Sequence, residues 1–151
     1  MTVHLARALA AAVAALVVLV GTPVPAQAIS PNDYGNGAFR ATNERRDAND
    51  LRRLTRGDCV QDFARRQANR MANQNRMFHQ DLGRVMRACN LVAVGENVAY
   101  GYPSGRATVR AWMNSSGHRA NILNRNFRGM GLAARKSRGV WYVSQVFGRH
   151  A

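Results

Sequence analysis

The sequence predicts an α+β domain, a three-layer α-β-α sandwich with a small antiparallel sheet between two layers of helices. Residues 127–135 and 140–147 have the composition of strands, and Lys136 to Gly139 between them indicate a hairpin turn. Apolar side chains of the second strand fall on both of its faces, Val140, Tyr142 and Val146 on one and Trp141, Val143 and Phe147 on the other. Each face therefore needs a cover, and helices are the only elements left in the chain to provide it.

The first half of the predicted domain is helical. Residues 38–54 are charged but contain the apolar residues Phe39, Ala48, Leu51 and Leu54, which indicates a helix with a polar face. Gly57 and Asp58 then break and cap the chain, and a clearly amphipathic helix follows. Its inward residues recur at helical spacing: Val60, Phe63, Ala64, Gln67, Ala68, Met71 and Ala72. Residues 29–37, in contrast, are rich in turn-forming residues and are predicted to be a flexible N-terminal segment.

Shorter elements complete the order. Asp81 is predicted to cap a helix that ends at Cys89, and residues 92–100 are predicted to form a short strand. Ser104 is predicted to cap another helix, which ends near residues 115–117, and a brief helix follows His118. The sequence contains no evident repeat or second domain, so one domain is predicted over residues 38–151.

The first 28 residues have the three regions of a secretory signal peptide. A weakly positive start precedes an apolar run at residues 8–20, and Ala26-Gln27-Ala28 forms an A-x-A cleavage pattern. The apolar run is shorter than the roughly 20 residues that a membrane-spanning helix needs. We therefore predict cleavage after Ala28, secretion to the extracellular space or the cell wall, and no stable membrane insertion afterwards.

The two cysteines, Cys59 and Cys89, would then lie in an oxidising compartment. An even number of cysteines in such a compartment favours a disulfide over two free thiols. The chain-entropy model gives roughly 3–4 kcal/mol of stabilisation for a disulfide that closes a loop of this length.

The chain is strongly basic, with a formal net charge of +14. Removing residues 1–28 removes one arginine and no acidic residue, which leaves a net charge of +13. Such a charge attracts anionic surfaces, so nucleic acids, teichoic-type polymers and acidic lipid head groups are candidate partners. The alternative is a solvated basic surface without a specific partner.

Two histidines and one glutamate are the candidate site residues. His4 belongs to the signal peptide and His150 lies next to the C-terminus, which leaves His79 and His118. Glu96 lies among small and apolar residues, and a carboxylate in such surroundings is expected to be paired. The two histidines, each beside a helical segment, are its expected partners.

These residues belong to an ordered series of blocks: Asn43-x-x-Arg46, Phe78-His79, Gly95 to Ala99 (GENVA), Trp112 to Leu123 (WMNSSGHRANIL) and Gln145 to Gly148 (QVFG). The series resembles the CAP superfamily, which is named for cysteine-rich secretory proteins, antigen 5 and pathogenesis-related 1 proteins and is also called the SCP domain. The resemblance spans residues 38–148. The short spacing between the blocks is similar to that of the compact bacterial, actinobacterial-type branch.

The resemblance implies an α-β-α sandwich and a central cleft lined by two histidines and acidic residues. On this chain the cleft residues are His79, Glu96 and His118, with the two histidines as metal ligands. Animal and plant members have a second acidic residue where this chain has Ser115. Two neutral imidazoles and one carboxylate still match a zinc-type site with an open position, so a weakly bound divalent metal is the expected cofactor. Seven residues are expected to support the cleft: Asn43, Arg46, Asn97, Trp112, Ser115, Asn121 and Gln145.

Three functions compete. The first is a secreted, monomeric, non-catalytic module whose cleft binds a divalent metal, a small molecule, a lipid or a cell-envelope ligand. The second is a protease-like hydrolase with Ser115 or Ser116 as nucleophile and Glu96 as the orienting acid. The third is a nuclease, because a basic surface can clamp phosphates beside an acid/base pair. The crowding of the serines against His118 favours binding over catalysis. A buried histidine and glutamate network that only holds the layers together is the structural alternative.

Overall fold

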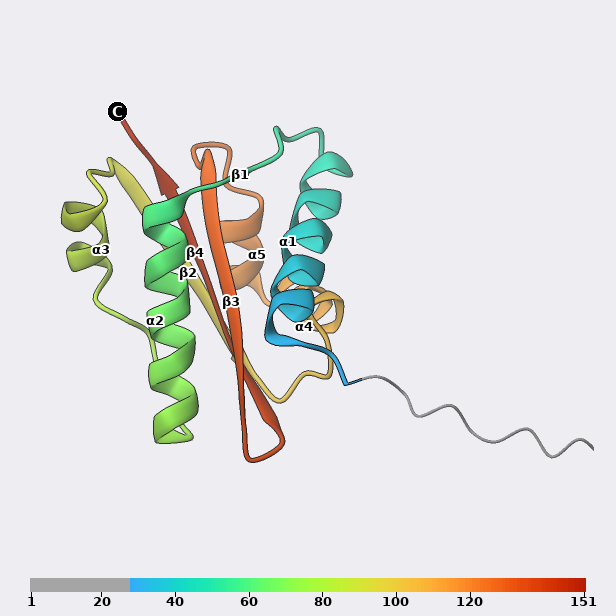
Figure 1. Ribbon diagram of the computed structural model, residues 1–151. Coiled ribbons are helices and arrows are strands. Elements are labelled where there is room, and N and C mark those ends of the chain that lie inside the picture. Colours follow the sequence, from blue (N-terminus) through green and yellow to red (C-terminus); the bar gives the residue numbers. More distant parts are fainter. Residues whose placement is uncertain (1–27) are drawn as a thin grey trace, which may run out of the picture.

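The computed structural model describes residues 28–151, and the predicted signal peptide, apart from Ala28, lies outside the described residues. Within this part, the elements are α1 (Pro31–Asp47), β1 (Thr55–Arg56), α2 (Asp58–Gln74), α3 (Leu82–Ala88), β2 (Ala93–Tyr100), α4 (Gly105–Met113), α5 (Ser116–Ile122), β3 (Gly129–Ser137) and β4 (Val140–Arg149). The strands form one sheet in the order β1-β3-β4-β2. Figure 1 shows α2 and α3 on one side of the sheet and α1, α4 and α5 on the other. The predicted three-layer sandwich is confirmed.

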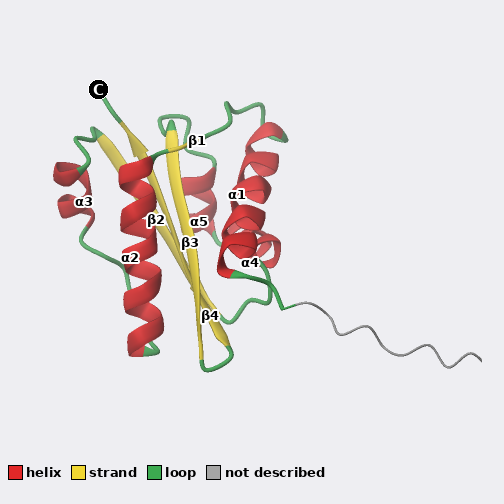
Figure 2. Ribbon diagram, in the orientation of Figure 1, coloured by secondary structure: helices red, strands yellow, loops and turns green. Residues whose placement is uncertain are grey.

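The sheet is mixed rather than purely antiparallel, and Figure 2 shows its long strands between the helices. Strands β2 and β3 both pair with β4 in antiparallel register. The two-residue strand β1 pairs with β3 in parallel, through Thr55 and Arg56. The predicted hairpin is present between β3 and β4, where Arg138 and Gly139 have φ values of 48° and 81°. Positive φ at both central residues is what a two-residue hairpin turn of type I′ requires.

The alternation predicted for the last strand separates two hydrophobic cores. Trp141, Val143 and Phe147 of β4 pack toward α1, α4 and α5. Tyr142 and Val146 lie on the other face, against α2 and α3. Since both faces of β4 are buried, this strand is the centre of the fold, and the side chains of its neighbours are sorted by the same alternation.

The prediction of a flexible segment at residues 29–37 is wrong, because α1 already begins at Pro31. The Ser30 side chain caps the helix, and Pro31 lies in the first turn, where a missing N–H has no helical partner to lose. Tyr34 is 1% exposed and its ring packs on Trp141. Tertiary packing therefore stabilises a helical turn that the local composition does not predict.

The remaining elements follow the predictions closely. Asp81 caps α3 and Ser104 caps α4 through side-chain oxygens that accept backbone hydrogen bonds. The disulfide between Cys59 and Cys89 is present, with Cα atoms 5.7 Å apart, and it joins the start of α2 to the end of α3. Helix α5 begins at Ser116, so His118 lies in its first turn rather than before it.

Candidate functional site

The candidate site lies at the edge of the sheet formed by β2. Successive side chains of a strand point to opposite faces, and Val98 of β2 packs on the α2 side. Glu96 therefore points toward α2 and α3, and Asn97 points toward α5. His79 lies between α2 and α3, whereas His118 lies in α5. The two histidines thus approach β2 from opposite layers.

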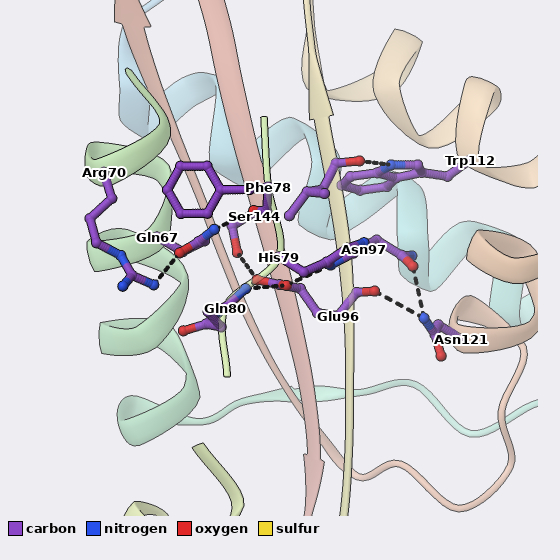
Figure 3. A network of polar contacts seen from close by, with 11 residues as sticks. Gln67, Arg70, Phe78, His79, Gln80, Glu96, Asn97, Trp112, Asn121 and Ser144 are labelled. Atoms are coloured by element: carbon purple, nitrogen blue, oxygen red, sulfur yellow. Dashed lines mark hydrogen bonds and ion pairs between the residues drawn. The ribbon is translucent and has the colours of Figure 1, made fainter. Parts of the chain in front are cut away.

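The buried Glu96 carboxylate has four hydrogen-bonding partners (Figure 3). Its Oε2 lies 2.8 Å from Nδ1 of His79 and accepts the Gln80 backbone N–H at 3.2 Å. Its Oε1 accepts from Gln80 Nε2 at 2.7 Å and from Ser144 Oγ at 3.1 Å. The Glu96 side chain is 0% exposed and that of His79 is 59% exposed. A carboxylate facing Nδ1 favours the proton there, so Nε2 of His79 presents its lone pair outward.

The segment that carries His79 is held against α2. Gln67 is fully buried, and its side-chain amide donates to the Phe78 carbonyl and accepts from Arg70. The guanidinium groups of Arg70 and Arg76 lie over the Phe78 ring, 5.8 and 5.0 Å from its centroid. These contacts fix the backbone just before His79, so the imidazole is positioned by packing as well as by Glu96.

A second polar network lies on the α5 side of β2. Asn97 donates to the His118 carbonyl at 3.2 Å and to Gln145 Oε1 at 3.0 Å. Asn121 donates to Asn97 Oδ1 at 3.0 Å, and Gln145 donates to Thr42 Oγ1 at 2.8 Å. Asn97, Gln145 and Thr42 are 0% exposed, and buried networks of this kind are stabilising only when their members are paired. The network connects β2 and β4 with α5 and α1, and it anchors the backbone of His118.

Two further side chains cap the outer edge of β2. Asn121 donates to the Glu96 carbonyl at 3.0 Å, and the Trp112 indole N–H donates to the Val98 carbonyl at 3.2 Å. In an antiparallel strand, backbone groups of alternate residues point away from the partner strand, here β4. At a sheet edge such carbonyls lack a partner. Trp112 and Asn121 therefore support the site by closing the edge of the sheet.

His118 is half-buried, and its ring lies 6.3 Å from the Trp112 ring, centroid to centroid. Burial lowers the pKa of His118 below its ordinary value of 6.5, and His79 lowers it further when it carries a proton on both ring nitrogens. The His118 imidazole is therefore neutral over a wider pH range than a free histidine. A neutral imidazole can accept a hydrogen bond from a ligand.

A cleft of about 220 Å³ opens beside His118. Its lining consists of Met77, Val98, Ala99, Tyr100, Tyr102, Ala111, Trp112, Ser115 and His118. Three of these side chains are strongly exposed for their type, Met77 at 43%, Tyr100 at 56% and Tyr102 at 37%. Apolar side chains gathered around a hollow, with a few polar groups at one end, are typical of a binding site.

Residues 39–147 match the cysteine-rich secretory protein family, CAP. The chain belongs to the CAP family. A curated relative of this CAP domain is the uncharacterized protein YkwD of Bacillus subtilis (strain 168), which is 32% identical over 127 residues. That alignment covers 80% of this chain and 49% of YkwD, so the chain spans about half the length of this relative.

Solved structures share the CAP fold. The SCP-domain-containing extracellular protein of Bacillus anthracis is 28% identical with a TM-score of 0.71, over 79% of this chain and 41% of that one. A cysteine-rich secretory protein of Staphylococcus aureus is 22% identical with a TM-score of 0.66, over 83% and 40%. An outer surface protein of Borrelia burgdorferi is 20% identical with a TM-score of 0.67, over 75% and 90%. In the described part of the CAP chain, no helix is both long and apolar enough to cross a membrane.

The predicted supporting residues of this CAP domain fall in two places. Asn97, Trp112, Asn121 and Gln145 surround β2 as described, and Ser115 lines the cleft as the residue before α5. Asn43 instead holds the turn after α1, donating to the Leu54 carbonyl at 3.0 Å and accepting its N–H at 2.8 Å. Arg46 also bonds to backbone carbonyls at that end of α1. Both therefore brace a loop rather than the cleft.

Several residues at the CAP site lack a signal in the sequence. Gln67, Gln80 and Ser144 complete the surroundings of Glu96 and His79, yet a polar residue among helical or strand positions has no spacing that marks it. Met77 and Tyr102 line the cleft from two connecting segments. The only signal in the sequence is that these residues are apolar or aromatic and lie in connecting segments. Their exposure becomes evident only in the fold.

The residues of the CAP cleft do not fit a three-ligand metal centre. Among residues 28–151, no group of three or more His, Cys, Asp or Glu side chains is placed to hold a metal ion. The Glu96 oxygens already face four hydrogen-bonding partners, which leaves two imidazoles as donors. Catalytic zinc sites have three protein ligands.

Proposed function

We propose that this CAP domain is a secreted, non-catalytic binding module whose cleft beside His118 takes the apolar part of a small amphipathic or lipid-like ligand. The observation that supports this proposal most strongly is the cluster of exposed apolar side chains at this cleft. Five large hydrophobic residues of the described chain are strongly exposed, Ile29, Met77, Val92, Tyr100 and Tyr102, and three of them line this one cleft. Exposed apolar surface is costly unless a partner covers it.

The imidazole of His118, which lines the cleft, supports recognition of a hydroxyl group. Burial favours the neutral form of His118. Its imidazole can therefore accept a hydrogen bond. A ligand with a hydroxyl head and an apolar body would match both parts of the site.

Binding rather than hydrolysis is supported by the surroundings of the serines. In the described residues, the hydrogen bonds of imidazole rings are those of His79 with Glu96 and of His150 with the Asn90 carbonyl. Ser115 and Ser116 thus have no imidazole positioned as a base, which serine nucleophiles require. Secretion is supported by the signal-peptide pattern, the disulfide and the extracellular description of a solved relative.

A titration with a dansyl-labelled fatty alcohol, followed by its fluorescence, tests the proposal. Met77→Ser and Tyr102→Ser are expected to weaken binding about tenfold or more, because burying an apolar side chain contributes roughly 1.5–3 kcal/mol. Val92→Ser is the matched control, since Val92 is 50% exposed but lies outside the cleft lining. Absence of saturable binding, or an equal loss in the control variant, would exclude this cleft as the lipid site.

A further inference from the structure

A buried guanidinium lies at the far end of α1, away from the cleft. Arg46 is 0% exposed. Its Nη1 donates to the carbonyls of Ile122 and Asn124 at 2.8 and 2.9 Å, and its Nε donates to the Arg52 carbonyl at 2.8 Å. All three acceptors are neutral. Burying a cation without a counter-ion is expensive, so this arrangement calls for a balancing negative charge.

The acidic neighbours of Arg46 in the sequence do not provide that charge. Asp47 pairs with Arg53, and Glu44 pairs with Arg106. Within the described residues, Nη2 of Arg46 is buried and has no hydrogen-bond partner. Burial lowers the pKa of Arg46, and the nearby charge of another arginine lowers it further. Leaving a buried N–H without an acceptor costs more free energy when the N–H belongs to a charged group than when it belongs to a neutral group.

Arg46 lines a pocket of about 190 Å³ at the surface. The other lining residues are Asp50, Leu51, Arg52, Arg125 and Arg128. They come from the loop after α1 and the loop between α5 and β3, which lie at the same end of the molecule (Figure 1). Four arginines and one aspartate thus line the pocket, so positive charge exceeds negative charge there. The pocket volume exceeds the roughly 30 Å³ of one water molecule, so it can hold a larger group.

The guanidinium group of Arg128, which lines the pocket, is held by hydrogen bonds to the backbone. Nη1 of Arg128 donates to the carbonyls of Arg125 and Phe127 at 2.6 and 3.0 Å, which holds its guanidinium in place. Preorganised guanidinium groups match the oxygens of phosphate-type anions, because each presents several N–H donors in a rigid plane. A water molecule would satisfy Nη2 of Arg46 but would leave the positive charge unbalanced.

We propose that this pocket binds a phosphate group, with Nη2 of Arg46 as the inner donor and Arg52, Arg125 and Arg128 around it. The site is separate from the apolar cleft and does not depend on the function proposed for that cleft. The phosphate group has two sources, a soluble or polymer-borne phosphate and a lipid head group, and the same oxygens would be recognised in both.

Nuclear magnetic resonance of the oxidised protein tests the proposal. Inorganic phosphate is expected to shift the Nε–H signal of Arg46 and the backbone amide signals of Arg52 and Arg125 along one saturable curve. Arg125→Gln and Arg52→Gln, both at the exposed rim, are expected to weaken binding about tenfold each. Arg46→Lys keeps the charge but removes Nη2, and it is expected to abolish the saturable response even where the variant remains folded.

The matched control is Arg110→Gln, which removes the same charge from an exposed position on α4. Unchanged phosphate affinity in this variant supports the pocket. Shifts spread evenly over many arginines, an equal loss in Arg110→Gln, or no saturable shift at Arg46 would overturn the proposal. Two probes distinguish the sources of the phosphate: glycerol phosphate represents a soluble or polymer-borne group, and vesicles of phosphatidylcholine with phosphatidylglycerol represent a lipid head group. Binding of either probe that is weakened in Arg125→Gln supports the proposal.

Discussion

Replacing the buried carboxylate, Glu96→Gln, is the sharpest test of the site geometry. The side chain keeps its shape, but one of its two oxygens becomes an NH₂ group. The remaining oxygen can still accept from Ser144 Oγ and Gln80 Nε2, as Oε1 does in the native protein. The new NH₂ group then faces His79 Nδ1 and the Gln80 backbone N–H, which Oε2 accepts in the native protein.

The two groups that face the new amide respond differently. His79 can move its proton from Nδ1 to Nε2 and accept from the amide, so the ring adopts the other tautomer. The Gln80 backbone N–H cannot reverse, and it loses its acceptor. The variant therefore has one unpaired donor, and its remaining hydrogen bonds are made to a neutral amide instead of a carboxylate. Together these two changes lower the free energy of unfolding by about 2–4 kcal/mol.

Urea denaturation and the ring ¹⁵N shifts of His79 measure these two effects. Glu44→Gln is the matched control, because Glu44 is an exposed carboxylate paired with Arg106, and exposed ion pairs contribute little. We expect a large stability loss and a changed tautomer only in Glu96→Gln. If Glu96→Gln were as stable as Glu44→Gln and the His79 shifts were unchanged, the carboxylate would not orient the imidazole.

Three further predictions concern protonation, metal binding and packing. The lowered pKa of His118 means that its contribution to stability is present above pH 6.5 and is lost as the pH falls through the lowered folded-state pKa. His118→Gln is expected to flatten this loss in urea melts at pH values on both sides of 6.5, and equal slopes would contradict it. Calorimetry with Zn²⁺ is expected to show only weak binding that His79→Gln abolishes, whereas tight stoichiometric binding would require more donors than two imidazoles. Gly131→Ala is expected to lower the unfolding free energy by about 1–3 kcal/mol, because a Cβ would lie 2.3 Å from the Gln61 nitrogen. Gly37→Ala, where a Cβ meets nothing within 4 Å, should leave the urea midpoint unchanged or raise it, and equal losses in both variants would refute the packing argument.

The layers of the fold could be predicted because β4 carries apolar side chains on both faces. A strand of this kind must lie inside, and the rest of the chain has helical spacing. The start of α1 could not be predicted, since Gly35 and its polar neighbours favour turns. Gly35 is nevertheless buried within α1, against β3, where a Cβ would make ordinary contact with the Leu132 carbonyl oxygen at 3.4 Å. Tertiary contacts of this kind override local propensity.

The site could be predicted only in part. The histidines and Glu96 stand out because such residues are few in this chain. Which histidine pairs with Glu96 depends on the face to which β2 turns it, and a register shift of one residue would reverse that face. The register is set by pairing with β4, which is far away in the sequence. The pairing with His79 and the separate place of Arg46 therefore become evident only in the folded chain.

Strand β2 links the two halves of the site. The Glu96 side chain orients His79 on one face, while the Glu96 carbonyl accepts from Asn121 at the outer edge. Asn121 in turn bonds to Asn97, which holds the His118 carbonyl on the other face. The His79 imidazole and the His118 backbone are thus both held by β2, on its opposite faces. A site built in this way favours a ligand of fixed shape, because preorganised groups lose little entropy on binding and adapt poorly to a different spacing.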